Sequence, residues 1–475
     1  MPSQQNHFHD STRAQQLQEA AYHLKNTGHF SEADEHLQEA IKILFSANQL
    51  AEASTIIRDQ LSAPWISVAQ RSHWHRYMGT VLHFMGDDQT ATQHYHQALS
   101  LAQNAGDQTS LMNAYQSLGC VIQGQDDENA KTSFEHSLAI ARELDDHAMI
   151  ATNCYQLGLL FQGQGDYNTA KKFYVDSLSA RKSIGDQKGL GATYHQLGII
   201  YHVQGDYRTA QRLYDQSLVI SNRLDDASGV AASLGQLGSI AQEQGDYTRA
   251  RKLYEASLDI SKRLGNQAHT AALHQNLGNL AFLQGDHESA RSLYEDSLAI
   301  KEKIGDRSGL ASTYHQMGAL AYDSGDYTTA RSHYERALAI SQSVGSPTST
   351  ASALHELAML AQDQGDYEEA QSRYAQSLSI FEELGDRSGM ATSSLQLGIV
   401  AKDAGNDQLA RSRYEQALAI YEGLGDHIGM ALAYHHLAVL AQLCGEAPQA
   451  ISVLLDKALR SEEHTSELQS RTVIS

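Results

Sequence analysis

Four histidines recur at one position of a repeating pattern: His195, His315, His355 and His435. Imidazole binds metals and titrates near neutral pH, so such a column could in principle do either. Successive members would lie on neighbouring helices, which pack about 8–10 Å apart. A metal instead needs all its ligands within about 2.0–2.3 Å. We therefore expect no metal site and no histidine-driven pH switch.

The usual catalytic and phosphate-binding motifs are absent from the sequence. It contains no G-x-x-x-x-G-K-[ST], H-E-x-x-H, G-x-S-x-G or C-x-x-C. Cys120, Cys154 and Cys444 are too scattered for a disulfide framework or a zinc site, and we expect them to be small buried hydrophobes. The sequence therefore predicts no enzyme, no cofactor and no small-molecule substrate.

Two further columns, together with the histidine column, carry side chains suited to recognition. A carboxamide column offers donors and acceptors together, and it contains Gln156, Gln196, Gln236, Asn276, Gln316 and Gln396. The column beside it contains Tyr155, Gln275 and the four histidines, and a turn further along lie Gln162, Gln242, Phe282, Tyr322 and Gln362. Such surfaces suit an extended peptide or a partner helix, and we expect Phe282 and Tyr322 to form an apolar anchor. The alternative is that glutamine, a good helix former, was copied with each repeat.

These columns belong to a unit of forty residues, typified by residues 186–225. Apolar positions at helical spacing predict two helices, joined at Gly205-Asp206, where glycine can end one helix and aspartate cap the next. Equivalent glycines stand forty apart from Gly165 to Gly445, and a second turn falls halfway, as at Gly185 and Asp225. A period in this range predicts a solenoid of helical hairpins.

Within this unit Tyr194, Leu197-Gly198, Tyr201, Ala210 and Tyr214 fit the pattern W-x2-L-G-x2-Y…A-x3-F. The chain thus resembles the tetratricopeptide repeat (TPR) family in its 40-residue form, as in Pins-type adaptors, rapsyn, kinesin light chain and bacterial signalling arrays. The resemblance implies an all-α, right-handed superhelical solenoid. It also implies that the first helix of each hairpin (helix A) lines the concave side and the second (helix B) the convex side. In peptide-binding relatives the carboxamide position often holds Asn, which bonds the ligand backbone.

The pattern divides the chain into four parts. We expect disorder in residues 1–11, a divergent TPR-like hairpin plus an extra helix in 12–63, and about ten repeats in 64–459, with Pro64 in the first turn of a helix. Residues 460–475 begin RSEEHTSELQS, which back-translates to a common sequencing adapter. We interpret them as an artefact, so the natural C-terminus stays open.

Composition narrows the class of partner. A formal net charge of −21 disfavours nucleic acid and favours basic partners. No apolar run approaches about 18 residues and no signal peptide is visible, which predicts no membrane insertion and a cytoplasmic location.

The leading hypothesis is therefore a protein–protein interaction scaffold or adaptor, which binds a partner protein or extended peptide in the concave TPR groove. The first alternative is the ligand-sensing TPR arm of a truncated multidomain bacterial signalling protein, such as an NTPase, peptidase, kinase or transcription regulator. The second is a peptide-pheromone receptor. Binding of a short free peptide would favour the receptor, and binding only to a folded protein would favour the scaffold.

Overall fold

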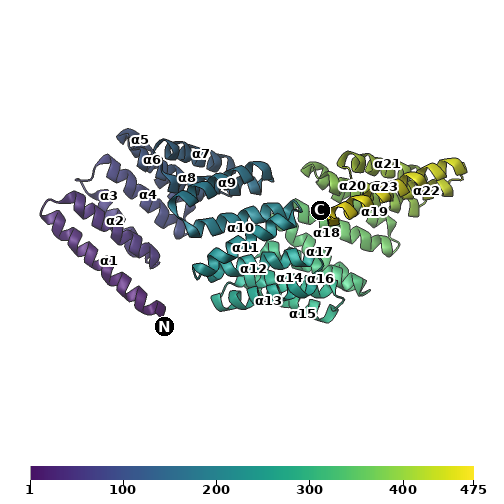
Figure 1. The fold of residues 1–475 in the computed structure, drawn as a ribbon, viewed down its shortest axis with the longest axis horizontal. Helices are drawn as coiled ribbons and strands as arrows, with labels where there is room; N and C mark the ends of the chain where they lie inside the picture. The colour runs from purple at the N-terminus through teal and green to yellow at the C-terminus, as the bar shows by residue number, and fades with distance from the viewer. Residues whose placement is uncertain (1, 475) are drawn as a thin grey trace. The chain divides into compact units, whose positions relative to one another are not determined.

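The computed structural model describes the backbone of residues 2–474 and the side chains of residues 12–461. Within that range every regular element is a helix, which confirms the all-α class (Figure 1). The helices are α1 (Pro2–Asn26), α2 (Phe30–Ser46), α3 (Leu50–Ser62), α4 (Val68–Phe84), α5 (Asp88–Ala105), α6 (Gln108–Ile122), α7 (Asp127–Glu143), α8 (His147–Gly163), α9 (Tyr167–Ile184), α10 (Gln187–Val203), α11 (Tyr207–Arg223), α12 (Ala227–Glu243), α13 (Tyr247–Leu264), α14 (Gln267–Leu283), α15 (His287–Ile304), α16 (Arg307–Asp323), α17 (Tyr327–Val344), α18 (Pro347–Asp363), α19 (Tyr367–Leu384), α20 (Arg387–Asp403), α21 (Asp407–Leu424), α22 (His427–Leu443) and α23 (Pro448–Ile474).

The chain divides into two compact units, Met1–Ser233 and Leu234–Ser475. In each unit a helix A packs on the following helix B, as α8 does on α9 and α16 on α17. Helix B likewise packs on the helix A of the next repeat within each unit, as α9 does on α10 and α17 on α18. This is the packing of a TPR solenoid. None of the described helices has the length and apolarity that a membrane crossing requires.

The turns form as the sequence predicts. Gly205 has φ +77°, a left-handed conformation that glycine adopts without strain. Asp206 then caps α11, because its Oδ1 accepts a hydrogen bond of 3.0 Å from the backbone N–H of Thr209. At the halfway turn Asp225 is one of the few non-glycine residues with positive φ, at 53°. The glycine of such a Gly–Asp pair therefore ends one helix, and the aspartate caps the next.

In most hairpins of the regular array, the core holds a tyrosine ring of helix B pressed against a glycine of helix A. Tyr214 and Ala210 on α11 are fully buried. A Cβ added at Gly198 on α10 would stand 2.6 Å from Tyr214 Cε1, well inside contact distance. The same contact recurs at Gly158 with Tyr174 and at Gly318 with Tyr334. The predicted close approach of helices A and B is confirmed.

Helix α1 begins at Pro2, and the predicted disorder of residues 1–11 stays a prediction. Two other expectations differ from the structure. Pro64 lies in a turn, and α4 starts only after Ser67, whose side chain accepts from Gln70 N in a capping box. Cys444 is exposed, because it is the C-cap residue of α22.

The other two cysteines fit the expected class of apolar side chain. Cys154 is buried and Cys120 half-buried, and burial raises the pKa of Cys154 to about 12 and that of Cys120 to about 11. Helix α23 continues through residues 460–474. The interpretation of this stretch as adapter sequence stays a prediction.

Candidate functional site

The predicted carboxamide column follows the A helices, and its side chains are neither open nor fully enclosed. All of its members are half-buried: Gln156, Gln196, Gln236, Asn276, Gln316 and Gln396. Glutamines on a purely solvated face would be exposed, so each of these side chains contacts protein on one side. Two of them, Gln156 and Gln196, make side-chain contacts to the A helix of the preceding repeat.

Gln196 forms hydrogen bonds that connect neighbouring repeats. Its Oε1 accepts from Gln162 Nε2 at 3.4 Å, which links α10 to α8 of the preceding repeat. A hydrogen bond with Gln196 also moderates the pKa of Tyr155, which burial raises. Gln156 similarly approaches Cys120 Sγ on α6, at 4.0 Å. The side chains of Gln156 and Gln196 thus connect successive A helices, and the role of the column in a binding groove stays a prediction.

In the column one turn further along, glutamine side chains accept hydrogen bonds from the buried tyrosines. Tyr174 OH donates to Gln162 Oε1 at 2.7 Å, and Tyr254 OH donates to Gln242 Oε1 at 3.2 Å. Where that column holds Phe282, which cannot accept, Tyr294 OH donates instead to Asn279 Oδ1 at 2.8 Å. Buried hydroxyl groups need such partners. Sequence reasoning missed this structural role, although the matching forty-residue periods of tyrosine and glutamine carried the signal.

The two residues predicted as an apolar anchor lie in different environments. Phe282 is half-buried and packs on the core cluster around Tyr294 and Leu298. Tyr322 OH donates to Asp363 on the next helix A, and that bond together with burial raises the pKa of Tyr322. A joint anchor made by the two rings stays a prediction.

The histidine column lies over the buried tyrosines. Ring centroids are 5.4 Å apart for His195 and Tyr214, 5.6 Å for His315 and Tyr334, and 5.0 Å for His355 and Tyr374. Burial lowers the pKa of His315 and of His355, so both are neutral at pH 7. Within the described residues no three His, Cys, Asp or Glu side chains converge as metal ligands would.

His195 and Gln196 line a cavity of about 240 Å³. Its lining residues come from α8, α10, α11, the turn after α11 and the start of α12, and all of them belong to the first unit. Polar groups of Tyr155, Ser217 and Asp226 share it with the apolar Ile220 and Leu224. It therefore combines apolar contact area with a few fixed polar groups, as ligand pockets do.

A second cavity has the same construction in the second unit. It measures about 180 Å³ and is lined by residues of α16, α17 and α18, among them His315, Ala337 and Ser349. Each of these stands 120 residues after a lining residue of the first cavity, namely His195, Ser217 and Gly229. Both cavities are of side-chain size.

In other repeats a buried basic side chain fills the corresponding space. Arg181, at the end of α9, donates from Nη1 to Asp186 Oδ2 at 2.7 Å and from Nε to Ser177 Oγ at 3.1 Å. Lys301, at the end of α15, is only 4% exposed and donates from Nζ to Thr313 Oγ1 at 2.8 Å. Burial lowers the pKa of Lys301, while Asp306 opposes that shift.

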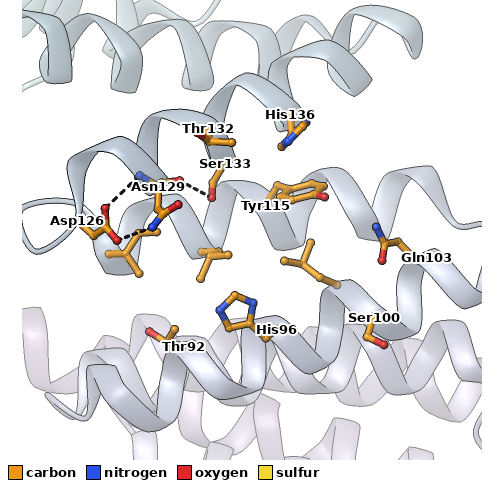
Figure 2. A pocket seen from close by; sticks show the side chains of 13 residues that line it. Thr92, His96, Ser100, Gln103, Tyr115, Asp126, Asn129, Thr132, Ser133 and His136 are labelled. Atoms are coloured by element: carbon orange, nitrogen blue, oxygen red, sulfur yellow. Dashed lines mark hydrogen bonds between the residues drawn. The ribbon is translucent and has the colours of Figure 1, made fainter.

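A larger cavity of about 610 Å³ lies on the helix B side, between α5, α6 and α7. Figure 2 shows His96 of α5 on one side of it, and Tyr115 of α6 with His136 of α7 on the other. The rings of Tyr115 and His136 are 5.0 Å apart. Helix α6 has 15 residues against 17 in α8 and α10. No sequence column pointed to this cavity.

A family profile described as "Tetratricopeptide repeat" matches residues 149–223, 189–260, 229–303 and 309–383. No curated protein matches the chain.

Solved structures share the fold at low identity. The apo quorum sensor NprR from B. thuringiensis is 16% identical, with a TM-score of 0.54, over 70% of this chain and 98% of its own. A STAND signal-transduction ATPase with a tetratricopeptide repeat sensor, from Pyrococcus horikoshii, is 12% identical, with a TM-score of 0.56, over 92% of this chain and 66% of its own.

A third structure is that of a Rap protein complexed with competence and sporulation factor. It is 11% identical, with a TM-score of 0.52, over 75% of this chain and 99% of its own. The repeat pattern, the helical hairpins and the profile matches agree with one another, and this chain is a tetratricopeptide repeat protein.

Proposed function

We propose that the chain binds an extended peptide segment along the faces of its A helices, and that it acts by binding rather than by catalysis. One observation carries the proposal: His195 and Gln196, from two predicted recognition columns, line one open cavity among three successive A helices. A cavity at this place receives a side chain, while carboxamides beside it can bond a backbone.

The solved relatives support a ligand-binding role for this kind of array. NprR is a quorum sensor, and the Rap protein was solved in complex with a competence and sporulation factor. The present cavities of about 240 Å³ and 180 Å³ suit single side chains rather than a whole small molecule. A peptide that presents side chains to separate repeats fits this arrangement.

A ligand-sensing arm is the second candidate. The repeat sensor of the STAND ATPase shares the fold over 92% of this chain. Both candidates use the same face and differ in the ligand. A short free peptide that binds by itself favours a peptide receptor, whereas binding only to a folded partner protein favours the scaffold.

The test is a selection of phage-displayed random peptides on the full chain, followed by affinity measurements on two tryptophan variants. Ala192→Trp places an indole at the cavity, because Ala192 is exposed and lines it. Val175→Trp is the matched control, since Val175 is 56% exposed on helix B of the neighbouring repeat. We expect selected peptides to lose at least about tenfold in affinity for Ala192→Trp, which corresponds to about 1.4 kcal/mol.

The control variant should bind as the wild type does. Equal affinity of wild type and Ala192→Trp for every selected peptide would contradict the proposal. Thermal melts of both variants exclude unfolding as the cause of a loss.

A further inference from the structure

The last buried position of helix B differs between repeats in a way that bears on the ligand. Arg181 and Lys301 occupy it in two repeats, and Ser221 and Ser341 in two others. The open cavities lie beside Ser221 and within the repeat of Ser341. The basic residues thus show what kind of group the same space accepts.

Arg181 makes a defined set of contacts. Its guanidinium bonds Asp186 and Ser177, as described above, and stacks over the ring of Tyr155, with Cζ 5.3 Å from the centroid. It also covers Gly189, where an added Cβ would stand 1.3 Å from Arg181 Nη1. The side chain is only 12% exposed. A carboxylate, a hydroxyl, a ring and a glycine therefore make up this site.

The cavity beside Ser221 repeats that set forty residues later. Asp226, Ser217, His195 and Gly229 are the counterparts of the four partners of Arg181, and all of them line the cavity. Asp226 Oδ1 accepts from Gly229 N at 3.1 Å, as Asp186 Oδ1 accepts from Gly189 N at 2.9 Å. The ring is an imidazole in place of the phenol of Tyr155, and the basic side chain is missing because residue 221 is serine.

Lys301 is a second, independent precedent. Its ammonium bonds Gln275 Oε1, the carbonyl oxygen of Gly309 at 3.2 Å, and Thr313. Gln275 and Gly309 are the counterparts of His195 and Gly229, which line the cavity beside Ser221. The site therefore accepts a guanidinium in one repeat and an ammonium in another.

We propose that the cavity beside Ser221 binds the basic side chain of an arginine or lysine presented by the peptide ligand. This inference rests on the proposed function and names the chemistry of the ligand. The net charge of −21 favours approach of a basic peptide. A planar guanidinium, more weakly hydrated than an ammonium, suits the space best. Among the residues lining this cavity Lys188, which is exposed, is the basic one.

The cavity in the repeat of Ser341 provides a contrast within the same chain. Helix α18 is capped by Ser346 instead of an aspartate, and no acidic residue is among the described residues that line that cavity. A buried cation without an opposite charge is unfavourable. We therefore expect no preference for basic side chains there.

The experiment uses N-acetyl-L-arginine amide and its neutral analogue N-acetyl-L-citrulline amide as probes. Binding is followed by the amide NMR shifts of Gly229 and Ser221 in the full chain. We expect the arginine probe to bind at least about tenfold more tightly, because only the guanidinium makes a charge-assisted bond to Asp226. The preference should disappear in Asp226→Asn, which keeps a cap, as Asn266 does on α14.

A second variant, Ser221→Arg, fills the cavity with the chain's own guanidinium and should abolish the response of Gly229 to both probes. Equal affinity for the two probes, no saturable response, or undiminished arginine binding in Ser221→Arg would overturn the inference. These outcomes are separable from the proposed function. Peptides selected on the wild type that bind without a basic residue would leave that function standing while refuting the arginine site.

Discussion

At the scale of single residues, the array depends on glycines that lack a Cβ at the point where helices cross. A Cβ on Gly158 would lie 2.5 Å from Tyr174 Cε1. The ring is fully buried, and its hydroxyl is held by Gln162, so it has little room to move. One repeat has Ala358 at the position equivalent to Gly158. Tyr374 is still fully buried there, but its hydrogen bond to Gln362 is 3.5 Å long, against 2.7 Å between Tyr174 and Gln162.

We predict that Gly158→Ala destabilises its hairpin by about 1–3 kcal/mol, because the added methyl group displaces the Tyr174 ring. Gly163 in the same helix provides the control, since an added Cβ there would meet nothing within 4 Å. Gly163→Ala should be neutral or stabilising by up to about 1 kcal/mol. Hydrogen exchange of α8 and α9 amides measures both, and equal effects would contradict this packing.

A pair of partly buried histidines makes the stability of the α4–α5 hairpin depend on pH. His75 Nδ1 and His94 Nδ1 are 2.9 Å apart, across the α4–α5 hairpin. Burial, with His94 and Arg71 nearby, lowers the pKa of His75 to about 4, and burial lowers the pKa of His94 as well. In an unfolded chain the pKa of histidine is about 6.5. The unfolded hairpin therefore binds more protons than the folded one between pH 6.5 and 4, so stability falls as the pH falls through that window.

We predict that the free energy of unfolding of the α4–α5 hairpin falls by on the order of 1 kcal/mol between pH 7 and pH 5, after allowance for solvent screening. The double variant His75→Gln with His94→Gln should lose less over the same range. Hydrogen-exchange protection of α5, compared at the two pH values, is the measurement. Identical losses in wild type and variant would show that the pair does not titrate as described.

At the scale of elements, helix B and the next helix A meet through residue pairs of complementary size. Phe381 lies against Gly389, and Tyr421 against Gly429, with an added Cβ 2.5 Å and 2.3 Å from the respective rings. Where helix B instead ends in Ser261, helix A offers a histidine, and Ser261 Oγ lies 2.9 Å from His269 Nδ1. In these three pairs a large side chain faces glycine or a small one faces a larger partner, whereas Ser221 and Gly229 are both small and line a cavity.

This complementarity predicts coupling between the two positions. Gly389→His alone overpacks against Phe381, and Phe381→Ser alone leaves a cavity. The double variant copies the Ser261–His269 pair. We expect it to be at least about 1 kcal/mol more stable than the sum of the single effects allows. Additive effects in a thermal double-mutant cycle would contradict the pairing.

The sequence indicated the elements better than it indicated the site. Gly205 and Asp206 identify their own turn because each residue type has a specific backbone role. The periodic columns also identified the face to which His195 and Gln196 belong. The cavity beside them could not be read from any one column, because it arises where Ser221 and Gly229 are both small. Likewise, the bond from Tyr174 to Gln162 depends on helix spacing.

At the scale of the whole molecule, both compact units are built from the same kind of helical hairpin, and individual repeats differ in the cavities that they contain. The first unit holds the acid-lined cavity beside Ser221, and the second holds its neutral counterpart. The chain also has a rival surface, the larger cavity between α5, α6 and α7 (Figure 2). The proposed function therefore assigns the peptide to the face of the A helices and not to this larger cavity.

The most direct test of that claim is hydrogen–deuterium exchange of the full chain with and without a peptide from the selection. We predict slower exchange with peptide in α10 (Gln187–Val203) and in residues 227–232, which line the cavity beside Ser221. Protection confined to α5 and α7, around the larger cavity, would place the ligand on the helix B side and contradict the account.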